Sequence, residues 1–326
     1  MAKTSAPATP RPRLSAEDTA KLTHRITFLS VLLAAVLFLV KLGVWLVSGS
    51  VSLLASLADS GLDVAAALGT FFAVRYAQSP PDSDHRYGHG KAEAFASLMQ
   101  AGLVFASAAL VGREAVTHFI HPEPIAAEGA AIAVMAVSTL AVAALVYAQN
   151  QVLAMTQSVA VHGDRAHYIA DIGCNIAALI GLGLALMFHE PRFDAAAGLV
   201  VALWLVWGAI HVLQEASKHL MDEELSDHER QEIVDLVSAD AQVKGVHQLR
   251  TRAAGPYVHM QMHLDLDPTL TLDEVHHIMV GAENRVLARF PAADILIHPD
   301  PRGRAEAHGG PFVEDTQSLP ASASAH

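Results

Sequence analysis

Six long apolar stretches limit what this chain can fold into more than any other feature. Each has roughly 20 residues or more, the length that an α-helix needs to cross the hydrocarbon core of a bilayer. They comprise residues 26–47, 51–78, 92–119, 130–149, 158–187 and 193–213. The chain is 52% hydrophobic and 17% charged over 326 residues, and the part after Gln214 has ordinary soluble composition. We therefore predict an α-helical membrane protein with six transmembrane helices and a soluble C-terminal part.

The second apolar stretch contains two aspartates, Asp59 and Asp63, among Ala, Leu, Val, Gly and Phe residues. Their i, i+4 spacing places both carboxylates on one helix face, one turn apart. A carboxylate at mid-membrane costs about 2.5–3.5 kcal/mol on the insertion scale, and such residues are functional by default. Two like charges also repel each other unless a cation or protons hold them. The alternative is a polar patch between helices.

The fifth apolar stretch repeats this pattern with His167 and Asp171, again at i and i+4. A lone intramembrane histidine is more often a core residue with satisfied hydrogen bonds than a ligand. Two matched pairs, however, offer one nitrogen and three carboxylates. This set suits a four-coordinate divalent metal ion, zinc foremost.

The overall composition narrows the function further. The chain contains 19 histidines, which points toward metal handling, and its net charge of −12 argues against nucleic acid as a partner. The single Cys174 excludes a disulfide framework and a cysteine-rich zinc finger.

The loops between the apolar stretches indicate the orientation in the membrane. The N-terminal flank and the loop of residues 75–91 are basic, whereas the alternate loops lack Lys and Arg apart from Arg192. The positive-inside rule therefore places both termini in the cytoplasm. Lys41 lies near enough to the end of the first stretch to extend its amine to the interface.

The basic loop also contains Asp82, His85 and His89. Helical or turn spacing brings these three side chains together, so they could close on a metal ion. The alternative is a solvated loop in which the two histidines have no role.

The C-terminal part is predicted to form a small α+β domain. Ser226 is a candidate N-cap with Glu229 three residues on, and residues 243–253 and 257–267 alternate like strands joined at Gly255-Pro256. Residues 271–290 fit an amphipathic helix, and residues 292–298 fit a third strand. The predicted domains are a disordered tail (1–20), a transmembrane domain (21–217), an α-β-β-α-β domain (222–302) and a second disordered tail (303–326).

Five potential metal ligands fall on strand ends and on one helix of this α+β domain. They are His247, His263, His276, His298 and Asp300. We interpret them as a second metal site, although histidines are also common on protein surfaces.

Taken together, these motifs resemble those of the cation diffusion facilitator family, of the bacterial zinc and ferrous-iron efflux type. The resemblance covers roughly residues 20–302. It rests on Gly49-Ser50-Val51-Ser52-Leu53-Leu54 before Asp59 and Asp63, His85-Arg86-Tyr87-Gly88-His89-Gly90-Lys91, His167 with Asp171, Leu249-Arg250-Thr251-Arg252, and Ile297-His298-Pro299-Asp300-Pro301. One departure is Pro299, where relatives often carry Gln, so no ligand role of that side chain is retained.

The resemblance implies a homodimer in the bacterial inner membrane with a metallochaperone-like cytoplasmic domain. By this resemblance the transport site consists of Asp59, Asp63, His167 and Asp171, and the loop site consists of Asp82, His85 and His89. A binuclear site at the cytoplasmic dimer contact would use His247, His263, His276, His298 and Asp300. Lys91 and Asp222 match a charge pair that helps to hold the two protomers together near the membrane.

The implied function is proton-coupled efflux of divalent cations from the cytoplasm, with Zn²⁺ foremost and Cd²⁺ and Fe²⁺ also accepted. Buried ligands replace the hydration shell of the ion, and rocking of helices exposes the site to either face in turn. Zinc requires deprotonated ligands, so protons compete with the metal, and His167 is the natural proton carrier.

Two other classes of protein were weighed against a transporter. An intramembrane metalloprotease would need a motif such as His-Glu-x-x-His, but His189-Glu190 runs into Pro191 and lacks the second histidine. We therefore do not expect an enzyme. A membrane metal sensor, whose cytoplasmic domain reports zinc occupancy, would not need four ionisable ligands inside the bilayer.

Overall fold

The computed structural model describes residues 14–48, 51–121, 129–188 and 192–303. The chain divides into two compact units, one of residues Ala20–Met221 and the other from Asp222 onward. Most of both predicted tails and the motif residues Gly49 and Ser50 lie outside the described residues. So do the side chain of Asp59 and those of a few other residues within the helices.

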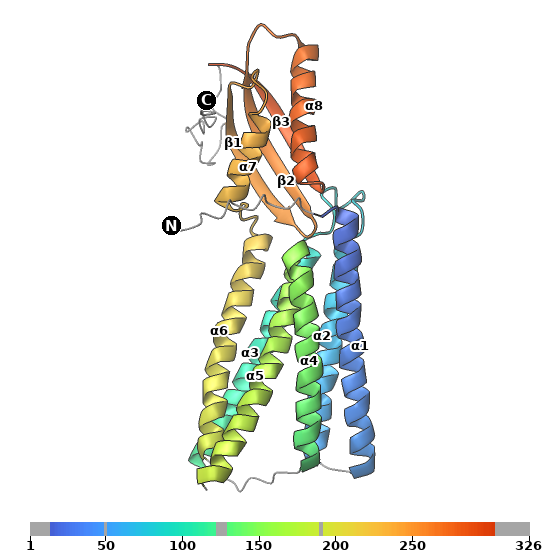
Figure 1. Cartoon of the computed structure of the whole chain (residues 1–326), viewed down its shortest axis with the longest axis vertical. Coiled ribbons are helices and arrows are strands. Elements are labelled where there is room, and N and C mark those ends of the chain that lie inside the picture. Colours follow the sequence, from blue (N-terminus) through green and yellow to red (C-terminus); the bar gives the residue numbers. More distant parts are fainter. Residues whose placement is uncertain (1–13, 49–50, 122–128, 189–191, 304–326) are drawn as a thin grey trace, which may run out of the picture. The chain divides into compact units, whose positions relative to one another are not determined.

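Six long helices form the first unit, which we call the helical unit (Figure 1). They are α1 (Ala16–Ser48), α2 (Val51–Ala77), α3 (Ala92–Ile120), α4 (Gly129–Thr156), α5 (Val159–Phe188) and α6 (Arg192–Leu220). Helix α1 begins within the stretch that the sequence assigned to a disordered tail. The Ser15 hydroxyl accepts a hydrogen bond from the Asp18 backbone N–H at 3.1 Å, and Glu17 and Asp18 lie in the first turn. These features favour a helix start at this point.

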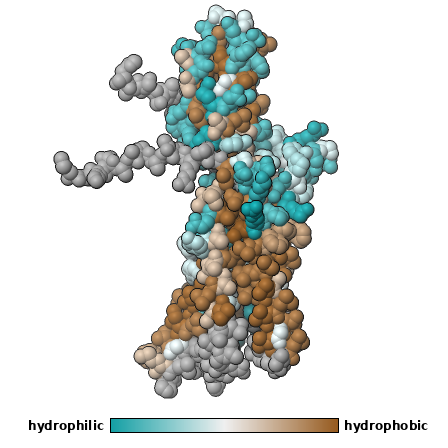
Figure 2. Space-filling model, turned by 45° about the vertical axis from the view of Figure 1, so that its right-hand side comes forward, coloured by the Kyte–Doolittle hydropathy of each residue, from teal (hydrophilic) through white to brown (hydrophobic). Residues whose placement is uncertain are grey.

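The outer surface of the helical unit is apolar. Figure 2 shows this unit mainly in brown, and large side chains such as Leu46, Leu140 and Leu203 are about 70% exposed. In the described residues, four helices (α1, α3, α4 and α6) are long and apolar enough to cross a membrane. Helices α2 and α5 carry the ionisable candidate ligands, so their sequences are less uniformly apolar. That these two helices also span the membrane stays a prediction.

Close packing of small residues brings α3 against α5. A Cβ atom on Gly163 of α5 would lie 2.9 Å from the Cα atom of Ser97 and 2.8 Å from its hydroxyl oxygen. Only glycine permits this approach, which is the usual role of small residues where membrane helices meet. The result is that the first turns of α5 lie deep inside the helical unit.

The second unit, which we call the C-terminal unit, has the predicted α-β-β-α-β order. Its elements are α7 (Asp227–Val237), β1 (Gly245–Ala254), β2 (Tyr257–Leu266), α8 (Leu272–Arg289) and β3 (Ala293–Pro301). The sheet order is β1-β2-β3, with β1 antiparallel and β3 parallel to β2. The predicted N-cap Ser226 accepts from the backbone N–H of Glu229, and Thr271 forms a full capping box with Glu274.

The core of the C-terminal unit lies between one face of the sheet and the two helices. Val258, Met260, Met262 and Leu264 alternate along β2 and are almost completely buried against residues of α7 and α8, such as Ile233 and Val286. Because strand side chains alternate between faces, the odd-numbered residues of β2 point to the opposite face. That face carries the histidines.

Candidate metal-binding sites

The structure brings three predicted ligands of the helical unit together. The Nε2 atom of His167 lies 3.2 Å from Asp63 Oδ1 on α2 and 3.8 Å from Asp171 Oδ2 on α5. One ligand atom from each residue lies within 4.8 Å of the others. We call Asp63, His167 and Asp171 the helical cluster. His167 is 7% exposed, whereas the side chains of Asp63 and Asp171 are 23% and 35% exposed, so the imidazole is the most buried part of the cluster.

The fourth predicted ligand, Asp59, belongs to α2, but its side chain lies outside the described residues. The neighbouring Ser60 is 2% exposed and accepts a hydrogen bond of 2.6 Å from Lys41 Nζ on α1. The amine of Lys41 therefore has a partner on a neighbouring helix, and its extension to the membrane interface stays a prediction. A long side chain in a bundle can reach either an interface or a neighbouring helix, and the helix spacing that decides between them is not visible in the sequence.

The loop between α2 and α3 folds its three predicted ligands into the loop cluster, Asp82, His85 and His89. Asp82 lies 3.3 Å from His85 Nδ1 through Oδ1 and 3.2 Å from His89 Nε2 through Oδ2. The backbone N–H groups of Asp84 and His85 both donate to Asp82 Oδ1. The hydrogen bond from His85 is the main reason why the pKa of Asp82 is lowered, which keeps the carboxylate ionised for a cation.

Strand register builds the third group, the sheet cluster of His247, His263 and Asp300. His247 of β1 is paired with His263 of β2, and His263 is paired with His298 of β3. Asp300 Oδ2 lies 2.8 Å from His263 Nδ1 and 3.3 Å from His247 Nε2. Its Oδ1 lies 3.2 Å from His298 Nε2, so one carboxylate contacts three imidazoles.

A β-bulge in β1 makes this convergence possible. The register shifts between His247 and Arg250, and Gln248 has a φ of 49°. A bulge inserts one extra residue and reverses which residues of the strand face a given side. His247 therefore shares a face with Arg250 and Arg252, although simple alternation would place it opposite to them.

The environment of the sheet cluster favours neutral imidazole. Burial lowers the pKa of His263, and this effect outweighs the hydrogen bond and charge of Asp300, which act in the opposite direction. A neutral imidazole has a free lone pair and is the form that binds metal ions. Together with a buried carboxylate, it provides a donor set that zinc accepts.

One residue of this site escaped the sequence analysis. Asp265 Oδ1 lies 3.6 Å from His247 Nε2, because Asp265 pairs with Gly245 of β1 and with Asp300 of β3. A Cβ atom on Gly245 would lie 2.7 Å from Asp265 Oδ2, so glycine leaves room for that carboxylate. Asp265 follows His263 by two residues, which places both side chains on the same face of the strand. This spacing could have identified Asp265 as a candidate ligand from the sequence.

His276 is not part of the sheet cluster. It is exposed on α8, and its ring lies 6.2 Å from that of His277. The resemblance to the cation diffusion facilitator family implied a role for it in a site at the contact between protomers. That assignment stays a prediction.

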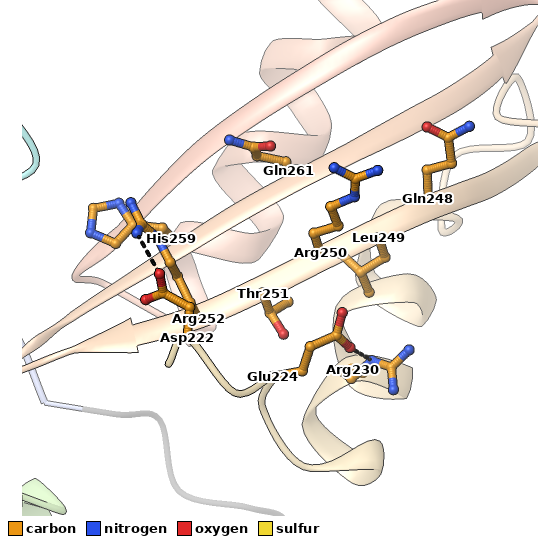
Figure 3. Close-up of a pocket in the computed structure, with 10 residues that line it drawn as sticks. All are labelled: Asp222, Glu224, Arg230, Gln248, Leu249, Arg250, Thr251, Arg252, His259 and Gln261. Carbon is orange, nitrogen blue, oxygen red and sulfur yellow. Dashed lines mark hydrogen bonds and ion pairs between the residues drawn. The ribbon is translucent and has the colours of Figure 1, made fainter. Parts of the chain in front are cut away.

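The predicted charge pair of Lys91 and Asp222 falls on different units, and each residue has a partner within its own unit. Lys91 Nζ donates to the Leu220 carbonyl oxygen at 3.3 Å. Asp222 Oδ2 accepts from Arg252 at 3.2 Å, beside a groove of about 560 Å³ along β1 (Figure 3). A second ion pair, between Arg230 and Glu224 at 2.8 Å, lies in the same groove. The groove is thus lined by ion pairs, and the contact between protomers stays a prediction.

Comparison with known proteins agrees with the division of the chain into two units. Residues 27–221 match the cation efflux transmembrane domain, and residues 225–302 match the cytoplasmic domain of cation efflux proteins. The chain belongs to the cation efflux family. The helical unit is therefore a transmembrane domain, and the C-terminal unit is the cytoplasmic domain, a type of domain associated with dimerisation.

Relatives of the cation efflux family match nearly the whole chain. The cation-efflux pump FieF of Klebsiella pneumoniae is 37% identical over 294 residues, which cover 90% of this chain and 98% of the pump. FieF of Serratia proteamaculans is 39% identical over 282 residues, covering 86% and 94% of the two chains. A solved structure of the putative zinc transporter CzrB in its zinc form is 27% identical over 26% of this chain, with a TM-score of 0.25.

Membership of this family decides between the classes of protein considered above. The family consists of membrane transporters of metal cations, so this chain is a transporter and not an enzyme.

Proposed function

We propose that this transporter moves Zn²⁺ out of the cytoplasm in exchange for protons, and that it also accepts Cd²⁺ and Fe²⁺. The observation that carries the proposal is the approach of His167 on α5 to Asp63 on α2, at 3.2 Å. These residues are 104 positions apart, yet they present ligand atoms to one point inside the transmembrane domain. With Asp59 and Asp171 they form the proposed transport site.

The chemistry of this site supports a borderline-soft divalent cation. Carboxylates alone suit hard ions such as Mg²⁺, whereas an imidazole nitrogen favours Zn²⁺. The carboxylates also compensate the divalent charge inside the membrane, where an unpaired ion is costly. The names of the relatives, cation-efflux pump and putative zinc transporter, agree with this range of substrates.

Proton exchange follows from the need for deprotonated ligands. Protons and metal compete for His167 and its neighbouring carboxylates, so protonation from one side would release the ion. Alternating exposure of the site to the two faces of the membrane would complete the cycle. The basic loops favour cytoplasmic termini, and hence export, in the inner membrane of a bacterium.

The other two clusters lie outside the membrane-spanning helices. We propose that the loop cluster binds a second metal ion. We further propose that the sheet cluster, completed by His276 and His298 at the dimer contact, links the zinc level to association of the two protomers. Metal binding to a folded dimer stabilises that dimer by mass action.

Zinc uptake into proteoliposomes that contain purified protein tests the proposal. With a pH gradient imposed, the wild-type protein should accumulate zinc and Asp63→Ala should not, although the variant should still insert and dimerise. Leu62→Ala, at the neighbouring and 59% exposed position, is the matched control and should transport normally. Near wild-type flux by Asp63→Ala would contradict the assignment of the site, and flux without a pH dependence would contradict proton exchange.

A further inference from the structure

A second polar cluster lies inside the transmembrane domain, and no motif pointed to it. Its centre is Asp164 on α5, which is 1% exposed. Asp164 precedes His167 by three residues and Asp171 by seven. These spacings place all three side chains along one face of α5.

Three other helices hold the Asp164 carboxylate through hydrogen bonds. Its Oδ2 accepts from the Ser30 hydroxyl of α1 at 2.7 Å and from Gln149 Nε2 of α4 at 2.8 Å. Its Oδ1 accepts from Gln100 Nε2 of α3 at 3.3 Å, and Gln100 also donates to Thr70 of α2 at 2.9 Å. Ser30, Gln100 and Gln149 are almost completely buried. The network thus joins α1, α2, α3, α4 and α5.

Gln100 and Gln149 each donate an amide hydrogen to the carboxylate, and these two hydrogen bonds favour its ionised form. An ionised carboxylate accepts hydrogen bonds at both oxygens. The three donors are neutral. Among the described residues, no Lys, Arg or His lies within ion-pair distance of Asp164, and the neighbouring Arg165 donates to Asn150 instead. In its ionised form, Asp164 gives this cluster a negative charge.

A buried charge without a counterion is expensive inside a membrane protein, and residues of this kind are functional by default. Hydrogen bonds from neutral groups spread the charge but do not cancel it. Two cations one helical turn away can interact with this charge: a divalent ion bound at the helical cluster and, when His167 is protonated, its imidazolium. In a buried environment, such attraction is much less screened than on a protein surface.

We infer that Asp164 supplies a buried negative charge that strengthens the binding of the divalent cation at Asp63, His167 and Asp171, without being one of its ligands. This inference rests on the proposed function of that site. Because the effect depends on charge and not on ligand type, Zn²⁺ and Mn²⁺ gain affinity alike. Asp164 is thus distinct from His167, whose nitrogen discriminates between them.

The structure also supplies an isosteric way to remove the charge. Gln100 Oε1 and Gln149 Oε1 are both buried without a hydrogen-bond partner. In Asp164→Asn, the new amide NH₂ can donate to one of these oxygens once that glutamine amide has turned over, so the network survives while the charge is lost. Folding is therefore expected to be preserved, and removal of a buried charge can even stabilise a protein.

The test uses the purified full-length protein, with zinc binding measured at equilibrium and zinc uptake measured in proteoliposomes. We expect Asp164→Asn to raise both Kd and KM about tenfold, with the maximal rate within about twofold of wild type and the melting temperature equal or higher. The shift should be the same for Mn²⁺. Ser30→Ala is the matched control, because it removes one donor and keeps the charge. It should lower the melting temperature and leave KM unchanged.

A double variant that exchanges the carboxylate of Asp164 with the amide of Gln149 provides a second test. Asp164→Asn combined with Gln149→Glu moves the carboxylate from α5 to α4 within the same hydrogen bond. We expect it to restore KM to within about threefold of wild type. A raised KM in a folded double variant would overturn the inference, and so would failure of both variants to fold, because Asp164 would then be only structural.

The remaining outcomes separate this inference from the proposed function. If wild type transports zinc, Asp63→Ala does not, and Asp164→Asn keeps the wild-type Kd and KM, the inference is wrong and the proposed site stands. If the wild-type protein neither binds nor transports zinc, the proposed function itself fails. An effect on zinc but not on Mn²⁺ would make Asp164 a ligand and would also overturn the inference.

Discussion

The helical cluster and the sheet cluster contain the same kinds of ligand but are assembled in different ways. In the helical cluster, two residues come from one helix at i and i+4, and the third comes from a neighbouring helix. In the sheet cluster, each ligand lies on a different strand, and the hydrogen-bonded ladder fixes their relative positions. Helices can slide or rock without breaking their own hydrogen bonds, whereas strands cannot. The comparison therefore suggests a moving site and a fixed one.

Surroundings also differ between the two clusters. The helical cluster lies in the transmembrane domain, close to the buried Asp164 network. The sheet cluster lies in the cytoplasmic domain, where Asp300 is buried and the neighbouring His298 is exposed. Under the proposed function, an ion in the first cluster is carried across the membrane, whereas an ion in the second exchanges with the cytoplasm.

Replacement of a carboxylate ligand should give the largest difference in zinc uptake between variants of the two clusters. Asp171→Ala removes a ligand that the ion needs inside the membrane, so we expect zinc uptake to fall by about 100-fold or more. Asp300→Ala removes the carboxylate shared by three histidines, but uptake should fall by less than about tenfold because the proposed transport site remains intact. Initial rates in proteoliposomes measure both. Equal losses of zinc uptake would contradict the prediction that only the helical cluster carries the ion.

Replacement of the nitrogen ligand tests whether the helical cluster also selects the ion. His167→Asp makes the site all-oxygen, which favours harder ions. We expect the preference for Zn²⁺ over Mn²⁺ to fall by a factor of about ten, which corresponds to about 1.4 kcal/mol. Competitive uptake at a fixed pH gradient measures the preference. An unchanged preference would place selectivity at another position, such as the loop cluster or the packing around Tyr168.

Stabilisation by zinc tests whether the sheet cluster binds metal in the folded domain. The domain has its own core, so the isolated segment 224–302 is a suitable sample. At a zinc concentration of about 100 times Kd, binding should stabilise it by about 2.7 kcal/mol and should promote dimers. Thermal unfolding and sedimentation give these two quantities. His263→Ala should abolish both effects, and a wild-type segment indifferent to saturating zinc would contradict the prediction.

The smallest expected effect concerns the acid stability of the same domain, away from either cluster. Hydrogen bonds from Thr271 lower the pKa of Glu274 in the folded state, so Glu274 contributes stability above its unfolded-state pKa. This contribution is lost as the pH falls through the folded-state pKa. Glu274→Gln keeps the capping geometry but does not titrate, so its stability should decline less between about pH 5 and pH 3. Denaturation of both metal-free proteins at several pH values measures their free energies of unfolding. If the two free energies fall in parallel as the pH decreases, the prediction is contradicted.

Local sequence spacing by itself determined much of this protein. The pairs Asp59/Asp63 and His167/Asp171 indicated ligands on helix faces, because i, i+4 neighbours meet whenever a helix forms. Alternation and capping residues predicted the α-β-β-α-β order of the cytoplasmic domain, and the caps at Ser226 and Thr271 are present. Such features depend only on residues a few positions apart, and the sequence displays those directly.

Contacts between distant residues were decided only by the tertiary structure. The bulge at Gln248 turns His247 toward His263, strand pairing adds Asp265, and helix packing gathers Ser30, Gln100 and Gln149 around Asp164. The amine of Lys41 on α1 likewise meets Ser60 on α2. Register and helix spacing result from the packing of whole elements, so no short stretch of sequence records which polar side chains will meet.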